Sequence, residues 1–196
     1  MPEPYTDLQK EAIINQIISL NKGISDFWKN SAGWAPIEAG QLLSKSRLDW
    51  QVSLSKSLKL WKGTLDPDAK EGCLILAWAN LGTLVEGTLK LFLSVYYDTY
   101  KNDSNALWEK GKLIDPDSVE LGKLRQFFKD GIWLPGQMHW DDWILKIQQR
   151  RNAIHAFKDR QIGTFDEFFE ELEQYQTFLQ EINSQLPYPD EGYIPR

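Results

Sequence analysis

The sequence predicts an all-α protein, a helical bundle of about five to six helices. Apolar residues recur at three- and four-residue steps through most of the chain, which is the spacing of one helix face. No segment shows the alternation of apolar and polar residues that a half-buried strand requires. The length of 196 residues suits one compact domain. We therefore expect a single domain over 1–196, with a core bundle over about 6–186 and an extended, proline-containing tail over 187–196.

Two helices are predicted in the first third of the chain. Thr6 caps the first, Asp7 makes its first turn acidic, and its apolar face comprises Ile13, Ile14, Ile17, Ile18 and Leu20. The segment 30–33 ends this helix. A second helix is expected from about Pro36 to Lys62, and Gly63 ends it. Its apolar positions are Leu42, Leu43, Trp50, Leu54, Leu58 and Trp61.

The third helix, expected from about Pro67 to Lys101, is the structural centre of the predicted bundle. It is apolar on all sides, which is typical of a helix enclosed by its neighbours. Its segment 73–97 is apolar enough to be compared with a membrane span, but it contains Asn80, Glu86 and Lys90. Each charged group would cost roughly 2.5–3.5 kcal/mol at the bilayer centre. We therefore expect a buried core helix and no membrane partner.

Two Asp-Pro-Asp segments, 66–68 and 115–117, are expected at helix starts. In each, the first Asp can cap the helix while Pro occupies the first helical position, where its missing N–H costs nothing. Closely spaced carboxylates can also bind a metal ion, but no His lies nearby in the sequence. We expect capping, and neither a metal nor a cofactor.

The last third of the chain predicts three more helices. A short helix covers 118–129, and a loop over 131–137 follows it. The fifth helix starts near Asp141 and Asp142 and runs through His155 towards Lys158. After Gly163 and Thr164 a sixth helix extends from Phe165 to about Leu186, with apolar residues at helical spacing.

Composition limits the functional classes. The net charge is −6 and the isoelectric point is about 5.0, which disfavours broad electrostatic binding of nucleic acid but allows a small local basic site. The single cysteine, Cys73, cannot build a disulfide framework, so it is expected to be a small core residue in a reducing compartment. The N-terminus has no basic and apolar leader, and we expect a cytoplasmic protein.

The residues that suggest chemistry lie in Arg150-Arg151-Asn152-Ala153-Ile154-His155. The sequence has no glycine-rich phosphate loop, nucleophile elbow or zinc-binding His-Glu-x-x-His segment. In a continuous helix Arg151 and His155 would share a face, with Asn152 beside His155. Guanidinium groups bind phosphoryl oxygens bidentately, and an imidazole exchanges protons near neutral pH. This patch therefore predicts a phosphate site.

A purely structural role is the alternative for the same residues. Arg151 lies beside the apolar stripe of the fifth helix, where an unpaired guanidinium would be costly. In this structural role Arg151 would pair with a carboxylate such as Glu86, and His155 would only pack against neighbouring side chains. Glu86 has two possible partners. It precedes Lys90 by four residues, which is a favourable spacing for a helical ion pair, and it could instead reach across the core to Arg150 or Arg151.

At these residues the chain resembles the HEPN superfamily. The resemblance rests on Arg150 and His155, separated by four residues on a late helix, and on the earlier segment 78–90 with its single Glu in an apolar helix. It covers about residues 70–185. It implies a HEPN-like bundle that forms a homodimer, with Arg and His of both protomers lining one cleft.

Active HEPN proteins are metal-independent endoribonucleases, frequently toxins or components of phage defence, and other members have lost catalysis. The resemblance implies that His155 is the general acid/base, that one arginine holds the phosphate of the RNA substrate, and that Asn152 is a polar helper. The ribose 2′-OH would attack the adjacent phosphodiester, leaving a cyclic phosphate and a free 5′-OH.

The chain departs from the family pattern in two ways. In the family, Arg-Asn is often followed by three residues and His, whereas only two residues separate Asn152 from His155. Arg150 restores the spacing, but Arg151 then takes the place of Asn, so either arginine could be catalytic. Members silenced by tyrosine nucleotidylation carry Tyr two residues after the His, where this chain has Phe157.

Two other functions fit the same sequence. A non-catalytic binding or scaffold module could use an antitoxin or another protein as its partner, and Trp28, Trp34, Trp133 and Trp140 near loops could form its surface. These tryptophans could equally form a small core beneath the loops. A pocket for a nucleotide or another small molecule between helices is the remaining possibility.

Overall fold

The computed structural model describes residues 4–63, 65–155 and 157–195. Outside these ranges lie residues 1–3, Thr64, Ala156 of the arginine-histidine segment, and Arg196 of the predicted tail. About 72% of the protein is helical, and the described residues form eight α-helices and one two-stranded hairpin. The prediction of an all-α helical bundle is confirmed.

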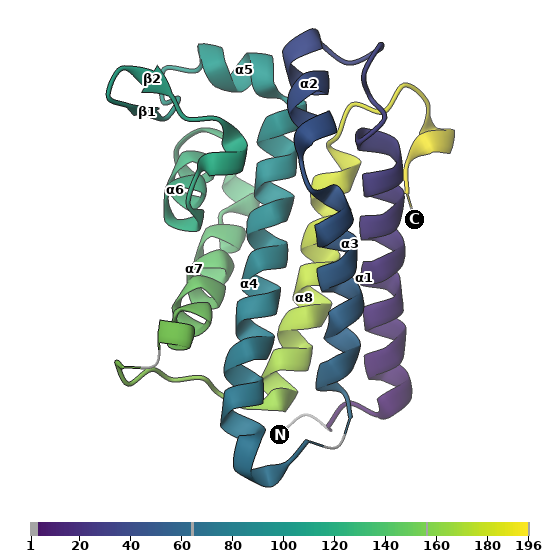
Figure 1. The fold of residues 1–196 in the computed structure, drawn as a ribbon, viewed down its shortest axis with the longest axis vertical. Coiled ribbons are helices and arrows are strands. Elements are labelled where there is room, and N and C mark those ends of the chain that lie inside the picture. Colours follow the sequence, from purple (N-terminus) through teal and green to yellow (C-terminus); the bar gives the residue numbers. More distant parts are fainter. Residues whose placement is uncertain (1–3, 64, 156, 196) are drawn as a thin grey trace.

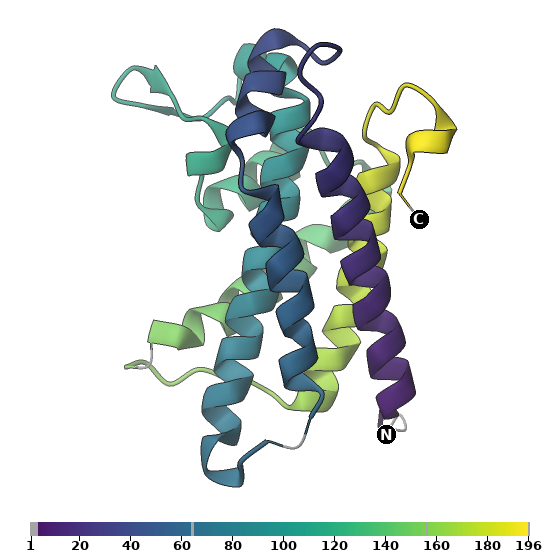
Figure 2. The same ribbon diagram turned by 45° about the vertical axis from the view of Figure 1, so that its right-hand side comes forward.

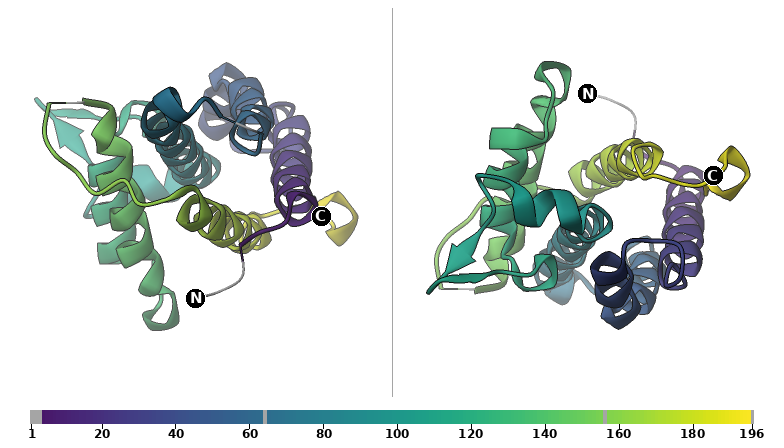
Figure 3. Two further views of the ribbon diagram at one scale, coloured as in Figure 1. Left: turned by 90° about the horizontal axis from the view of Figure 1, so that it is seen from below. Right: turned by 90° about the horizontal axis from the view of Figure 1, so that it is seen from above.

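Four helices run along the long axis of the molecule and form the bundle (Figure 1): α1 (Asp7–Trp28), α3 (Leu48–Ser57), α4 (Lys70–Val95) and α8 (Phe165–Ser184). Figure 3 shows these four helices end-on, and α7 (His139–Arg151) outside them. In Figure 2, α7 crosses the bundle at an angle. It packs against α4 and α6 (Leu121–Gly131). Two short helices, α2 (Ile37–Lys45) and α5 (Tyr97–Asn102), cover one end.

Side chains cap the first and the last helix, and the cap of the first helix by Thr6 was predicted. The Thr6 side chain accepts a hydrogen bond from the backbone N–H of Gln9, and the Gln9 side chain accepts one from the N–H of Thr6. Thr164 and Glu167 form the same reciprocal capping box at the start of α8. These caps satisfy N–H groups that the helix itself leaves without a partner.

Helix α4 lies at the centre of the core. Its buried residues face all directions, and Trp78, Leu81, Leu84, Val85 and Leu89 are completely inaccessible to solvent. The span Pro67–Val95 is long and apolar enough to cross a membrane, but 56% of its most apolar window is buried inside the bundle. Such burial is typical of the core helix of a soluble protein.

The predicted second helix is wrong, because the chain forms two helices there. Helix α2 ends at Lys45, Ser46 is extended, and α3 begins at Leu48. The Ser46 hydroxyl donates to the carbonyl of Leu42, and the Arg47 guanidinium binds Asp49 and stacks on Trp50. Local side-chain bonds of this kind compete with helix continuation, and periodicity alone does not reveal them. A 3₁₀ turn, Leu58–Trp61, follows α3.

A small β-hairpin corrects the expectation of an entirely strand-free chain. Strands β1 (Trp108–Glu109) and β2 (Lys112–Leu113) pair in antiparallel register across the turn Lys110-Gly111. Both turn residues have positive φ, 49° and 76°, which matches the tight hairpin turn that follows right-handed strand twist. Two residues per strand are too few to produce a recognisable alternation in the sequence.

The two Asp-Pro-Asp segments behave differently from each other. Asp66 caps the 3₁₀ turn Pro67–Ala69 that leads into α4, because its side chain accepts from the N–H of Asp68. Asp115 makes no such cap and instead accepts a hydrogen bond from the hydroxyl of Tyr97. The predicted capping by Asp115 is therefore wrong. The helix expected over 118–129 starts later, at Leu121, after another 3₁₀ turn.

The ends of the third helix and the tail also differ from expectation. Helix α4 stops at Val95, and α5 follows after the non-helical residue Tyr96. The tail is not simply extended, because it contains the 3₁₀ turn Glu191–Tyr193 and packs back on the bundle. The Asn183 side chain donates to the carbonyl of Pro195, whose ring packs against Gly23 of α1.

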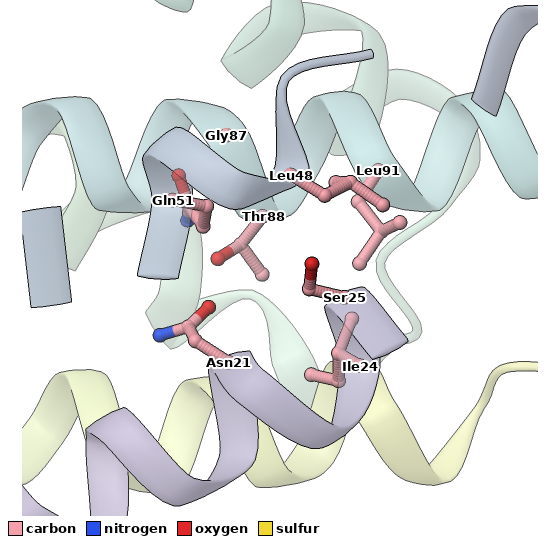
Figure 4. Close-up of a pocket in the computed structure, with 8 residues that line it drawn as sticks. All are labelled: Asn21, Ile24, Ser25, Leu48, Gln51, Gly87, Thr88 and Leu91. Carbon is pink, nitrogen blue, oxygen red and sulfur yellow. The ribbon is translucent and has the colours of Figure 1, made fainter. Parts of the chain in front are cut away.

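A polar network lies inside the otherwise apolar bundle. The fully buried hydroxyl of Tyr175 lies 3.1 Å from the Thr88 hydroxyl, and the Asn21 amide donates to Ser55 at 2.9 Å. Figure 4 shows Asn21, Ser25 and Thr88 around one small cavity between α1, α3 and α4. Its volume of about 10 Å³ suits a single water molecule at most, so we assign this network to the core rather than to a ligand.

Most of the loop-proximal tryptophans belong to the core. Trp28, Trp133 and Trp140 are 1%, 7% and 2% exposed, whereas Trp34 is 46% exposed. The structural alternative of a core beneath the loops is therefore confirmed for three of the four. Cys73 is half-buried, which is less than the full burial expected for it.

Candidate functional site

Arg150 anchors the loop between α7 and α8. Its Nη1 donates to the carbonyl of Ile162 at 2.9 Å and to the Glu167 carboxylate at 3.1 Å. The guanidinium also lies over the Trp78 ring, 4.8 Å from its centroid, and the Trp78 indole N–H donates to the same Ile162 carbonyl at 2.7 Å. With its side chain only 13% exposed, Arg150 has a structural role.

The loop conformation depends on this anchor. Gly163 has a φ of +69°, and a Cβ there would lie 1.9 Å from both the Arg150 Nη1 and the Glu167 carboxylate. The hydrogen bond from Arg150 lowers the pKa of Glu167 below its ordinary value, so this carboxylate stays charged at neutral pH.

Arg151 points in another direction, towards α4. Its Nη1 forms a salt bridge with Glu86, and its side chain remains 30% exposed. The aliphatic stem crosses α4 at Gly82, one turn before Glu86. A Cβ at Gly82 would lie 2.5 Å from the Arg151 Cδ and 2.9 Å from its Cβ. Gly82 therefore makes room for the arginine that Glu86 binds.

Glu86 is shared between two cations. Its second oxygen lies 2.7 Å from the Lys90 ammonium, which also donates to the carbonyl of Asp117. Burial alone would raise the pKa of Glu86, but the hydrogen bonds from Lys90 and Arg151 outweigh it and lower the pKa below the ordinary value. The ionised carboxylate thus holds Arg151 in place at neutral pH. Both sequence hypotheses for Glu86, the Lys90 pair and the bridge to Arg151, are confirmed.

The helix that carries the arginines ends earlier than predicted, at Arg151. Asn152 is its half-buried C-cap residue, and Asn152–His155 form a 3₁₀ turn. In a 3₁₀ helix residues turn by about 120° each, so the predicted shared α-helical face of Arg151 and His155 does not exist. Because Arg150 binds Ile162, the chain must turn back soon after α7. A helix continued to Lys158 would carry it about 10 Å further away.

His155 lies on the surface beyond the end of α7. Its side chain is exposed, as are two large apolar neighbours, Ile154 at 46% and Phe157 at 104%. The imidazole is thus accessible to a substrate. Exposed apolar side chains on both sides of it are typical of a surface that a ligand or another chain covers.

A groove of about 410 Å³ opens on the other side of Glu86, between α4 and the junction of α2 with α3. Leucines line it together with Trp50, which is 58% exposed and lies under the Arg47 guanidinium at 4.0 Å. Glu86 and Lys90 contribute its charged wall. This size and lining are typical of small ligand pockets, although no sequence pattern located the pocket or selected its ligand.

Metal chemistry finds no support in the described residues. They contain no group of three or more His, Cys, Asp or Glu side chains placed to hold a metal ion. Within this part of the chain the two histidines have separate surroundings, since His139 lies against Trp140 and the carbonyl of Gly136.

Comparison with protein-family models, curated proteins and solved structures finds no match to this chain. The function is therefore inferred from the fold and from the geometry of the side chains.

The structure brings part of the predicted site together. Glu86 and Arg151 meet, whereas Arg150 is bound to the α7–α8 loop and His155 lies beyond the helix end. The role of Gly82 was missed, although its spacing of four residues from Glu86 is visible in the sequence. A small residue one turn from a buried charge can indicate where a long side chain crosses.

Proposed function

We propose that this protein is a metal-independent endoribonuclease of HEPN type, with His155 as general acid/base and Arg151 as the phosphate-binding group. The observation that carries the proposal is the accessibility of both groups. His155 is exposed, and Arg151 binds Glu86 through Nη1 alone while its side chain stays 30% exposed. The guanidinium N–H groups of Arg151 that do not bind Glu86 can donate to a phosphate.

Between the two arginines, the contacts favour Arg151. Arg150 is engaged by a carbonyl, a carboxylate and an indole ring, so binding a substrate would release the loop that it anchors. Arg151 can bind a phosphate without such rearrangement. Asn152 ends α7 and lies between Arg151 and His155, where its amide could contact the ribose.

The chemistry requires two proton transfers. One imidazole removes the proton of the ribose 2′-OH, whose oxygen attacks the adjacent phosphorus, and a second, protonated imidazole donates to the departing 5′ oxygen. The bond from phosphorus to the 5′ oxygen breaks, which leaves a cyclic phosphate and a free 5′-OH. A homodimer would supply both imidazoles, and exposed Ile154 beside His155 is suited to such an interface.

The test is cleavage of single-stranded RNA in the presence of EDTA. We expect His155→Ala to reduce the rate by about 10²–10⁴-fold, the usual contribution of a general acid/base. His139→Ala is the matched control, because it removes the other imidazole from the surface near the start of α7. Cleavage that needs added metal, or that survives in His155→Ala, would refute the proposal.

A non-catalytic binding module is the second candidate, and the groove beside Glu86 favours it. The groove exposes Trp50 over a floor of buried and half-buried leucines, on a protein of net charge −6. If wild-type protein cleaves no RNA but a stable protein partner is lost on Trp50→Ala, this second function replaces the first. Both functions would use the same bundle.

A further inference from the structure

A basic hollow lies on the side of α7 that faces the α7–α8 loop. Its volume is about 500 Å³, and Lys146, Gln149, Arg150, Arg160 and Gln161 line it. Three of these side chains are cationic, the other two are amides, and no carboxylate of the described residues belongs to the lining. In a chain of net charge −6 this concentration of positive charge is unusual.

The surrounding contacts hold the cations in place. Lys146, Gln149 and Arg150 share one face of α7 because they are three and four residues apart. The Lys146 ammonium is bound by the nearly buried carboxylate of Glu171, yet its side chain is 45% exposed. Arg160 comes from the α7–α8 loop, which is fixed two residues later where Arg150 and Trp78 both bind the Ile162 carbonyl.

This arrangement is suited to an oxyanion. The Lys146 and Arg160 groups can donate into the hollow, while Arg150 adds its positive charge at the wall and keeps the hydrogen bonds that anchor the loop. Cations that face each other across an open hollow bind a phosphate more readily than a neutral ligand. The amides of Gln149 and Gln161 can add hydrogen bonds without adding charge.

We propose that this hollow binds a backbone phosphate of single-stranded nucleic acid, a few nucleotides from the bond that the Arg151 and His155 site cleaves. The position of Phe157 favours a nucleic-acid strand over an acidic peptide. Its ring is fully exposed in the segment that joins His155 to Arg160, where a base could stack on it. Cationic grooves combined with exposed aromatic rings are typical of sequence-independent single-strand binding. The inference rests on the proposed ribonuclease function for its substrate.

The test measures binding rather than cleavage. Oligo(dT) is the probe, because it has no 2′-OH and cannot be cleaved, and inorganic pyrophosphate is a second, minimal probe. We compare wild type with Lys146→Gln/Arg160→Gln. The matched control is Lys110→Gln/Lys112→Gln, which removes two charges from the hairpin at the opposite end of this side of the molecule (Figure 1).

For wild type we expect binding of both probes, weakened about tenfold or more in the Lys146/Arg160 variant and unchanged in the control. The slope of log affinity against log salt for oligo(dT) should fall by about 0.7, the contribution of one lost single-strand phosphate contact. Circular dichroism of both variants should match the wild type, because Lys146 and Arg160 lie at the surface.

Three results would overturn the inference: equal oligo(dT) affinity in the two double variants, no oligo(dT) binding by wild type, or equally strong binding of poly-glutamate. The outcome is independent of catalysis. If oligo(dT) binds as expected while RNA is never cleaved, the ribonuclease proposal fails and the strand-binding site stands.

Discussion

Adjacent arginines on α7 have different surroundings because a helix turns by about 100° per residue. Arg150 points to the α7–α8 loop and Arg151 points to α4. Arg150 therefore fixes the conformation of the loop, whereas Arg151 remains accessible to solvent. From the sequence, Glu86 was expected either to pair with Lys90 or to reach across the core to one of the two arginines. The sequence could not distinguish the two arginines, because the loop that engages Arg150 has no recognisable pattern.

We expect Arg150→Lys and Arg151→Lys to affect stability unequally. A lysine at 150 keeps the charge, but it cannot lie over Trp78 and bind Ile162 and Glu167 at the same time. The free energy of unfolding should therefore fall by about 1–3 kcal/mol. A lysine at 151 can still reach Glu86 from a partly exposed position, so the free energy of unfolding should fall by roughly 1 kcal/mol or less. Urea denaturation measures both, and the reverse order would contradict the assigned roles.

The pKa of Glu86 predicts a pH dependence of stability. Because the folded protein lowers this pKa below the ordinary value of 4.5, ionised Glu86 stabilises the fold above that pH, and the stabilisation is lost as pH falls through the folded pKa. The stability difference between wild type and Glu86→Gln should be constant near neutral pH and shrink in acid below about 4.5. Urea denaturation at a series of pH values tests this, and a difference that grows in acid would refute it.

At the scale of elements, the approach of α7 to α4 depends on a missing side chain. Gly82 allows the Arg151 stem to lie directly on α4, which brings its guanidinium to Glu86 one turn further along. Helix–helix distances depend on the side chains at the contact, so a methyl group here must displace α7 or the arginine.

Gly82→Ala should therefore destabilise the protein by about 1–3 kcal/mol through overpacking. Gly72→Ala is the matched control, because Gly72 lies in the same helix and a Cβ there meets nothing within 4 Å. That control should be neutral or more stable by up to about 1 kcal/mol, the helix propensity gain of alanine. Denaturation midpoints that change equally in the two variants would contradict a role for Gly82.

Element boundaries were predictable where one residue acts locally, and not where distant contacts decide. Thr6 and Thr164 identify helix starts because a hydroxyl caps a nearby N–H whatever the tertiary structure. The split at Ser46 is a separate case, because local side-chain bonds compete with the helix there and the apolar periodicity does not reveal them. The end of α7 depends on a distant contact with Ile162, eleven residues beyond Arg151. This is why the predicted common face of Arg151 and His155 was wrong.

At the scale of the whole molecule, the C-terminal tail packs against the helical bundle. The tail returns to the ends of α1 and α8, where Tyr188 accepts a hydrogen bond from the Trp28 indole at 3.0 Å and donates to Asn183 at 2.6 Å. Phe27 and Trp28 pack against Tyr188 with tilted rings, whose centroids lie 4.8 and 5.4 Å away. Burial raises the pKa of Tyr188 to about 12, so the hydroxyl keeps its proton and the network persists at physiological pH.

Deleting residues 188–196 should therefore destabilise the entire bundle, by roughly 2–4 kcal/mol, because it uncovers an aromatic cluster and leaves the Trp28 and Asn183 side chains without their partners. Tyr188→Phe keeps the ring and removes only the hydroxyl, so a smaller loss of about 1–2 kcal/mol is expected. Urea denaturation followed by tryptophan fluorescence measures both, and the deletion should also shift the emission to longer wavelength as Trp28 meets water. A deletion variant as stable as the wild type, with unchanged emission, would mean that the tail lies on the bundle without stabilising it.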